Sequence, residues 1–490
     1  MKFKINTTLK HISSTIVAEI TILLSFIFVY RILAHKLGPQ AVGAYSLTKT
    51  VIALLVPFLI LGFWVGIPRY LAISKDSKEG SSYLKSGIFA VFSFTFLFII
   101  VANIFKDFSA NIFFGDPKYT GLIFPFSLFL VGLMLYNINY AYFRGKMMIK
   151  TLNLSQIFTV AAPSLVVILF LRNSSVEQLI TNIALTTLLV AVFFSTFFWK
   201  ELFIMVDWNQ LKTSFKNIFY FSISRAFGNF ATIGILSLGP ILATHVTNMV
   251  QVGYLSISQS LLGGISVFLS PMGTILLPKV SKHVGENDHK TIEENVDFLI
   301  SAIFYVFIFV SIQAVIFSDI VITFWLGPIF ISAVPVARII LAPMVFYAMF
   351  LALATVLDAV KTKPINTINS LISLSFFLVA FVLLLLLKIF TPIISLSVSY
   401  SSALILLGCL TYFSIRKIYP NGVKKDLNHL LSALLFSAIL GVFSLSMKNF
   451  IENKFLYFII FGIIVVMIYF LLLWFFQKEW VKQIFTKAVS

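Results

Sequence analysis

The sequence predicts an all-α integral membrane protein with about 14 transmembrane helices. Of its 490 residues, 59% are hydrophobic and only 11% are charged, whereas soluble domains average roughly 45–50% apolar and about 25% charged residues. The apolar residues form long runs separated by short breaks, and no break has room for a soluble catalytic domain. One membrane crossing takes about 20 apolar residues, so each run is long enough to span the bilayer.

Charged residues or clusters of Pro, Gly and Asn bound each apolar run. The polar start of the chain has no small-residue cleavage site before a second run, so we expect the first run to stay in the protein as a helix. In chain order, the predicted spans are 12–34, 41–67, 84–104, 120–142, 152–171, 179–198, 218–242, 250–277, 297–317, 331–356, 365–387, 392–413, 429–447 and 454–476.

The net charge of +18 would suggest a nucleic-acid partner on a soluble protein. Here 25 of the 36 basic residues fall in segments on one side of the predicted spans, and seven fall on the other side. The side richer in Lys and Arg is the cytoplasmic one. The sequence therefore predicts a multi-pass protein of the cell (plasma or inner) membrane with both termini in the cytoplasm and no nucleic-acid partner. The single cysteine, Cys409, excludes an internal disulfide and a cysteine-based metal site.

Two stretches of the chain resemble each other at a nearly fixed offset. Paired glycines, prolines and basic residues at helix ends argue against chance matching between apolar segments. The matches are Val42-Gly43, Ser46 and Pro68-Arg69 with Val252-Gly253, Ser256 and Pro278-Lys279, 210 residues later, and Phe105, Asp107 and Gly115 with Phe317, Asp319 and Gly327, 212 residues later.

Each repeat unit would hold six helices, so the two units have the same orientation and should be related by an axis along the membrane normal. We therefore expect two pseudo-symmetric six-helix lobes plus two C-terminal helices. The predicted parts are an N-lobe at 1–200, a cytoplasmic interfacial linker at 201–217, a C-lobe at 218–417, and two further helices with a cytoplasmic tail at 418–490.

Five ionisable side chains lie inside predicted spans, where each costs at least about 2.5–3.5 kcal/mol near the membrane centre. Such groups normally face a cavity or a partner, although those near a span end can also extend to the membrane surface. Four of the five are cationic, so we expect a hydrated cavity that binds an anion. Guanidinium groups suit phosphate oxygens in particular. The candidate anion-binding residues are Arg31, Lys49, Arg225 and Arg338.

Polar side chains at helical spacing indicate which helices line this cavity. The fifth ionisable residue, Glu19, is a candidate gate or coupling group. It shares a depth with Arg225, so the two could form a salt bridge that closes the cytoplasmic side, and a static ion pair is the alternative. The predicted polar lining residues are Ser46, Gln156, Asn229, Gln259 and Asn369.

Signatures of an enzyme are missing from the sequence. No phosphate-binding loop of the form Gly-x-x-x-x-Gly-Lys-Ser/Thr occurs. The six histidines lack the spacing of metal ligands, and the outer loops carry single carboxylates instead of pairs. We therefore predict no catalytic residue, no metal site and no cofactor.

The stretch 31–46, with Leu37-Gly38-Pro39 followed by Gly43 and Tyr45, resembles the Wzx-like polysaccharide-type flippases. These form the polysaccharide branch of the multidrug/oligosaccharidyl-lipid/polysaccharide exporter superfamily. Their pattern is met except that His35 stands where Arg is usual. The resemblance covers most of the chain and continues at Phe113-Phe114-Gly115, Tyr142-Phe143-Arg144-Gly145, Val252-Gly253-Tyr254 and Pro278-Lys279-Val280-Ser281.

This resemblance implies a flippase. Its cargo would be a polyprenyl-diphosphate-linked oligosaccharide, the repeat unit of O-antigen lipopolysaccharide, capsule or exopolysaccharide, which moves from the cytoplasmic to the outer leaflet by alternating access. Membrane lipids, a polysaccharide polymerase and chain-length machinery are the candidate partners. Two alternatives stay open: a cation-coupled drug or metabolite antiporter of the same fold, and a non-transport membrane component of glycan assembly.

Overall fold

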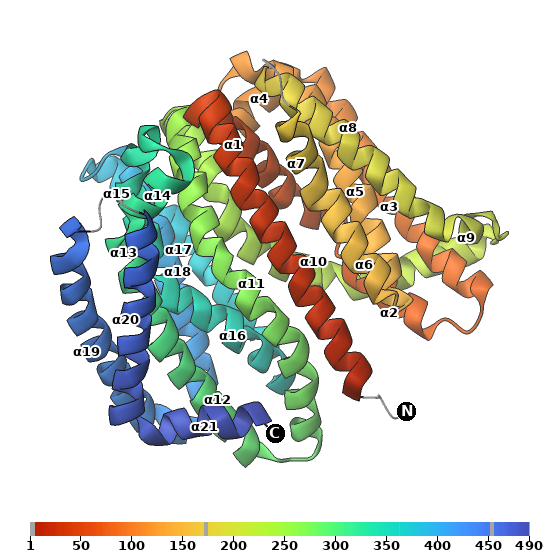
Figure 1. Cartoon of the computed structure of the whole chain (residues 1–490). Helices are drawn as coiled ribbons and strands as arrows, with labels where there is room; N and C mark the ends of the chain where they lie inside the picture. Colours follow the sequence, from red (N-terminus) through yellow and green to blue (C-terminus); the bar gives the residue numbers. More distant parts are fainter. Residues whose placement is uncertain (1–4, 171–174, 362, 451–454, 490) are drawn as a thin grey trace. The chain divides into compact units, whose positions relative to one another are not determined.

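The computed structural model describes the backbone at residues 5–170, 175–361, 363–450 and 455–489 (Figure 1). Side chains are described over the same ranges except at 5–13, 224–229, 268, 270–279, 282, 449, 455–456 and 484–489. The described chain is helical and contains no strand, which confirms the predicted all-α class. Its helices form two compact units, Met1–Ser256 with Phe390–Leu396 and Ile257–Ile389 with Ser397–Ser490.

The first unit contains the N-terminal half of the chain and the short segment Phe390–Leu396, which includes the start of α18 (Pro392–Arg416). Its elements are α1 (Ile5–Leu59), α2 (Phe63–Ile73), α3 (Ser77–Ile104), α4 (Lys106–Phe114), η1 (Pro117–Leu122), α5 (Ile123–Gly145), α6 (Ile149–Gln156), η2 (Ile157–Ala161), α7 (Ala162–Leu169), α8 (Val176–Ser195), η3 (Thr196–Phe198), α9 (Trp199–Phe203), α10 (Trp208–Val246) and the start of α11 (Met249–Gly285).

The second unit continues from α11. Its further elements are α12 (His289–Ile303), η4 (Phe304–Ile308), α13 (Phe309–Ile316), α14 (Ser318–Leu326), η5 (Pro328–Ala333), α15 (Val334–Leu341), α16 (Met344–Val360), α17 (Ile365–Leu387), most of α18 (Pro392–Arg416), η6 (Pro420–Gly422), α19 (Val423–Met447), η7 (Lys448–Phe450), α20 (Phe455–Phe476) and α21 (Lys478–Val489).

Helix α1 contains the first two predicted spans and folds back on itself at Gly38. That glycine has φ 77° and ψ −174°, a conformation that only glycine adopts readily. Residues at nearly equal distances along the chain on either side of it meet: the rings of Tyr30 and Tyr45 lie 5.9 Å apart, and Lys49 Nζ lies 3.5 Å from the centre of the Phe26 ring. The two halves of α1 are therefore antiparallel, and the predicted break after residue 34 is confirmed.

The second predicted span, 41–67, is not one continuous helix. Leu61 (φ 52°) and Gly62 (φ 72°) are in the left-handed region and separate α1 from α2. A Cβ atom at Gly62 would lie 3.2 Å from the carbonyl carbon of Ser222 on α10. The break thus occurs where two backbones approach too closely for any side chain, which hydropathy cannot reveal.

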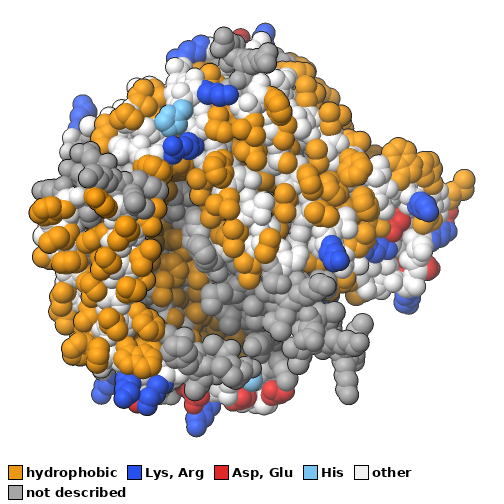
Figure 2. All heavy atoms as spheres, in the orientation of Figure 1, with side chains coloured by type: hydrophobic (Ala, Val, Ile, Leu, Met, Phe, Trp, Pro, Cys, Tyr) orange, Lys and Arg blue, Asp and Glu red, His pale blue; other side chains and the backbone are white. Residues whose placement is uncertain are grey.

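Ten helices are long and apolar enough to cross a membrane, or eleven if the bent pair Pro328–Leu341 and Met344–Val360, at 49°, counts as one span. That count covers the described residues and takes α1 once, although α1 has two antiparallel halves. The protein is a multi-pass membrane protein, and fourteen crossings remain a prediction. Figure 2 shows hydrophobic side chains over the visible sides of both units, as expected of surfaces that face lipid.

Two segments from the predicted repeat fold alike, one in each unit. Helices α4 and α14 each have nine residues and each follow a phenylalanine, Phe105 or Phe317. Each ends at a glycine with positive φ, Gly115 (78°) or Gly327 (93°), and is followed by a 3₁₀ helix whose first residue is proline, Pro117 or Pro328. This agreement supports the internal repeat, while the boundaries predicted for the two lobes remain predictions.

The two C-terminal helices pack within the second unit. Ser444 on α19 donates a hydrogen bond to Gln313 Oε1 (2.9 Å), and Tyr469 on α20 donates one to the carbonyl of Tyr305 (2.6 Å). The indole N–H of Trp480 on α21 donates to Ser301 Oγ (2.7 Å). These bonds hold the last three helices against α12, η4 and α13.

Candidate functional site

The loops of the first unit form two separate groups. In one group, Glu201 contacts Lys146 Nζ (3.1 Å), and its carbonyl accepts a hydrogen bond from Ser81 (2.6 Å), while Lys78 pairs with Asp207 (3.4 Å). In the other group, the turn after Gly38, the 114–119 turn and the 244–250 turn line one pocket. The first group holds segments predicted to be cytoplasmic, and the second holds segments predicted to be outside.

Lys49 is a cation that lies over two aromatic rings. Its Nζ lies 3.5 Å from the centre of the Phe26 ring and 5.4 Å from that of Tyr45. No ion pair in the described part of the chain includes Lys49. Aromatic faces stabilise a cation by about 0.5–2 kcal/mol but do not neutralise it. The described contacts therefore leave the Lys49 ammonium group without a neutralising counter-charge within a predicted span.

Glu19 lies beside Gln156, another predicted site residue. The Gln156 amide donates a hydrogen bond to Glu19 Oε1 (2.9 Å). One turn away, the Asn153 amide donates to Ser14 Oγ (2.7 Å). A polar ladder thus joins α1 to α6, and the structure brings together two residues that the sequence placed in separate roles. The side chain of Arg225, the proposed partner of Glu19, lies outside the described residues, so that salt bridge remains a hypothesis.

Arg338 belongs to a charge cluster in the second unit. Its Nη2 lies 3.6 Å from Asp319 Oδ2, and its Nε donates to Ser318 Oγ (3.2 Å). Lys448 Nζ also donates to Asp319 Oδ2. Two cations therefore share one carboxylate, and the cluster retains a positive charge. Nearly half of the Arg338 side chain is exposed.

The remaining predicted site residues have different surroundings. Ser46 is buried on α1, with its hydroxyl 3.1 Å from that of Tyr30, and Asn369 is buried on α17, where it donates to Ser414 (3.2 Å). The amide nitrogen of Gln259 on α11 is buried and has no hydrogen-bond partner among the described residues. Arg31 is partly exposed in the two turns before Gly38. The side chain of Asn229 lies outside the described residues.

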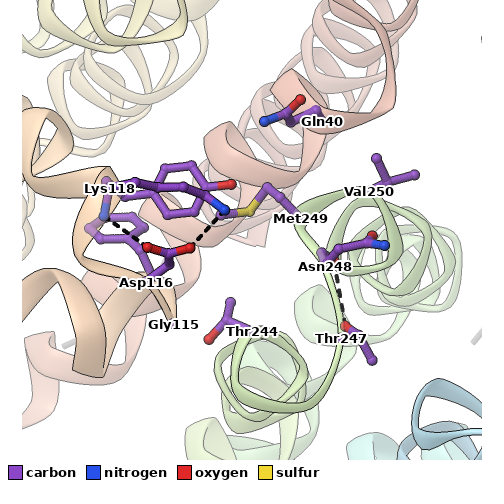
Figure 3. Close-up of a pocket in the computed structure, with 11 residues that line it drawn as sticks. Gln40, Gly115, Asp116, Lys118, Thr244, Thr247, Asn248, Met249 and Val250 are labelled. Atoms are coloured by element: carbon purple, nitrogen blue, oxygen red, sulfur yellow. Dashed lines mark hydrogen bonds and ion pairs between the residues drawn. The ribbon is translucent and has the colours of Figure 1, made fainter.

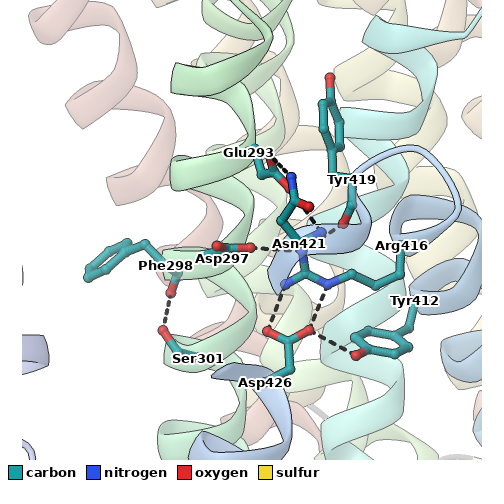
Figure 4. A network of polar contacts seen from close by, with 9 residues as sticks. All are labelled: Glu293, Asp297, Phe298, Ser301, Tyr412, Arg416, Tyr419, Asn421 and Asp426. Atoms are coloured by element: carbon teal, nitrogen blue, oxygen red, sulfur yellow. Dashed lines mark hydrogen bonds and ion pairs between the residues drawn. The ribbon is translucent and has the colours of Figure 1, made fainter. Parts of the chain in front are cut away.

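One buried network was missed by the sequence reasoning, which counted Arg416 only among the cytoplasmic charges. Its guanidinium binds both oxygens of Asp426, through Nε (2.6 Å) and Nη2 (2.7 Å), and Nη1 donates to Asp297 (2.7 Å) (Figure 4). Tyr412 also donates to Asp426 (2.8 Å). The network joins α12, α18 and α19. Arg416 and Asp426 lie in one predicted loop, 10 residues apart, whereas Asp297 begins a predicted span 119 residues before Arg416, so no spacing along the chain could have joined all three.

Comparison with known proteins agrees with this architecture. The model of a family described as "Polysaccharide biosynthesis protein" matches residues 8–284. The solved structure of the lipid II flippase MurJ, in an inward closed conformation, is similar with a TM-score of 0.73 and 16% identity, covering 96% of this chain and 100% of that chain. An inward-facing multidrug resistance MATE family transporter of the MOP superfamily has a TM-score of 0.68 and 12% identity, covering 84% and 99%. No curated protein sequence matches the chain significantly.

Proposed function

Because this chain belongs to the polysaccharide biosynthesis protein family, we propose that it is a flippase for a polyprenyl-diphosphate-linked oligosaccharide. It would move this cargo from the cytoplasmic to the outer leaflet of the cell membrane. A fold shared with a lipid II flippase supports the proposal. The cargo would be the repeat unit of O-antigen, capsule or exopolysaccharide, and a polymerase with chain-length machinery would consume it. No covalent step is needed, so the protein would act as a transporter and not as an enzyme.

The observation that best supports an anionic cargo is the environment of Lys49. A cation at membrane depth requires a counter-charge or water, since burying it alone is costly. Only aromatic rings accompany Lys49 among its described contacts. A diphosphate group that enters the site would supply the missing negative charge. The sugars would then bind to polar side chains, and the prenyl chain would stay in the lipid.

Transport would follow from the repeated architecture. Two related bundles can alternate between states open to either side, and a cargo shifts the balance only by binding one state better than the other. The Glu19–Gln156 bond lies on α1 and α6, near the loops predicted to be cytoplasmic. Protonation or cation binding at Glu19 would remove the charge that this bond stabilises and would thereby couple transport to an ion gradient.

A second candidate function is a cation-coupled antiporter for drugs or metabolites. The favouring observation is Glu19, an acid within a predicted span that is held by an amide and not by a base in the described structure. The fold is also that of multidrug resistance MATE transporters. The two candidates differ in their cargo and can be separated by direct transport measurements.

The deciding experiment reconstitutes the protein in liposomes with a fluorescent polyprenyl-diphosphate glycan. We expect protein-dependent translocation, a loss of at least about tenfold in rate for Lys49→Gln, and substantial activity for Lys49→Arg. Lys106→Gln is the matched control, because it removes the same charge from an exposed position on α4. Drug efflux without glycan translocation would reject the flippase. Equal rates for the wild type and Lys49→Gln would remove Lys49 from the site.

A further inference from the structure

A pocket of about 390 Å³ lies among three loops of the first unit (Figure 3). These are the bend of α1 at Gly38 and the two loops that join α4 to α5 and α10 to α11. All three belong to the side predicted to face outward. The volume falls within the range of about 300–1,000 Å³ that is typical of small-molecule sites. Its polar side chains are those of Gln40, Asp116, Lys118, Thr244, Thr247 and Asn248.

The walls of this pocket are fixed by the backbone. Gly115 has φ 78°, and a Cβ atom there would lie 2.7 Å from the carbonyl carbon of Thr244, so only glycine lets the 114–119 turn rest on the end of α10. Asp116 Oδ1 accepts a hydrogen bond from the backbone N–H of Lys118 (2.9 Å). Asn248 Oδ1 accepts one from the backbone N–H of Gln251 (3.0 Å), which caps α11. The pocket is therefore organised before any ligand arrives.

The pocket is polar but nearly neutral. Asp116 and Lys118 form an ion pair with N···O 2.7 Å, so their charges cancel. The Asn248 cap uses its side-chain oxygen and leaves the amide N–H groups available. The Gln40 amide is exposed and makes no hydrogen bond to another described residue. The ring of Tyr119, whose centre lies 5.1 Å from Lys118 Nζ, adds an apolar surface.

We propose that this pocket binds a neutral saccharide of one or two sugar units. Amides and hydroxyls can donate to and accept from sugar hydroxyls, and an aromatic face can cover the apolar face of a sugar ring. The Asp116 carboxylate disfavours a phosphate, and the Lys118 ammonium disfavours a free cation. This inference rests on the proposed function and deepens it: the pocket holds the sugar portion of the cargo on the receiving side, apart from the cationic residues that bind the diphosphate.

The test uses the full chain in nanodiscs and measures saturation-transfer NMR with a panel of neutral hexoses and N-acetylhexosamines. The double variant Gln40→Ala/Asn248→Ser removes both amides and keeps a residue that caps α11. We expect at least one saccharide to bind the wild type and the double variant to bind it at least about tenfold more weakly, since each lost bond weakens binding severalfold. Asn111→Ser is the matched control, because Asn111 is exposed on α4 outside the pocket.

Three results would overturn the proposed saccharide site: no binding by any saccharide on the panel, binding that the double variant leaves unchanged, or displacement of the saccharide by inorganic pyrophosphate. Glycan translocation is measured in parallel. Saccharide binding at the pocket without translocation by the wild type would reject the flippase and retain the site. Translocation without such binding would reject the site and retain the flippase.

Discussion

Gly43 and Gly253, which the predicted internal repeat places at matching positions, pack against each other. A Cβ atom at Gly43 would lie 3.1 Å from the backbone nitrogen of Gly253, and one at Gly253 would lie 3.2 Å from that of Gly43. The contact is reciprocal, because each glycine lies against the backbone of the other helix. Small residues at such a crossing allow close backbone packing within a membrane.

We expect Gly253→Ala to destabilise the protein by about 1–3 kcal/mol, the cost of overpacking at a tight contact, because the new Cβ would lie 2.7 Å from the carbonyl oxygen of Pro39. Gly263→Ala is the control on the same helix. Among the described residues outside its own helix turn, no atom lies within 4 Å of a Cβ at Gly263, so this change should be neutral or mildly stabilising. The measurement is thermal unfolding in detergent, followed by size-exclusion chromatography. Equal unfolding temperatures for both variants would contradict the close crossing.

Replacing Arg225 should abolish surface polysaccharide in cells without lowering the amount of protein in the membrane. Arg225 lies on α10 within a predicted span, where a cation is costly to retain without a role. Lys212→Ala on the same helix is the control, because Lys212 is exposed near the predicted cytoplasmic end. Polysaccharide staining and membrane immunoblots test this together. Normal polysaccharide in Arg225→Ala would remove this residue from the transport site.

Glu19→Gln should abolish the response of translocation to an imposed proton or sodium gradient. A glutamine can still accept the hydrogen bond from Gln156 but cannot ionise, so folding is preserved while the charge is lost. Translocation rates in liposomes with and without the gradient give the measurement, with Glu177→Gln, at an exposed position, as the control. An unchanged gradient response in Glu19→Gln would assign Glu19 a static role.

Asp426→Asn should cost about 3–5 kcal/mol of stability, the usual effect of breaking a buried ion pair on one side. Asp426 and Arg416 are almost wholly buried, and their bond is two-pronged. The exposed pair Glu479–Lys482, with side chains 89% and 59% exposed, provides the control Glu479→Gln, which should change stability by less than about 1 kcal/mol. The unfolding temperatures of both variants measure these losses of stability. Similar small losses would show that the network contributes little.

Saccharide binding to the proposed pocket should be constant between about pH 5 and 8. The Lys118 ammonium beside Asp116 lowers the pKa of that carboxyl. A lowered carboxyl pKa keeps the ion pair intact above the usual titration range of aspartate, and the pair is lost only as the pH falls through the lowered value. Saturation-transfer titrations across this range provide the test. A marked change in affinity near neutral pH would mean that another group controls the pocket.

Local sequence determined the class and much of the architecture. Long apolar runs require helices, because helical bonding satisfies every backbone group within a membrane. The break at Gly38 and the similar segments that end at Gly115 and Gly327 also follow from residue types whose conformational preferences are strong. The site was only partly foreseeable: Lys49 and Glu19 stood out, since an ionisable residue in an apolar run is conspicuous in any sequence.

Tertiary structure alone decided how these residues are paired. Gln156 lies beside Glu19, Arg338 and Lys448 share Asp319, and the break at Gly62 lies against Ser222. Each of these contacts joins separate segments of the chain. The polar pocket assembles from three loops whose residues look unremarkable one by one. Hydropathy and spacing report on one helix at a time, whereas charge pairing and close packing depend on which helices become neighbours in space.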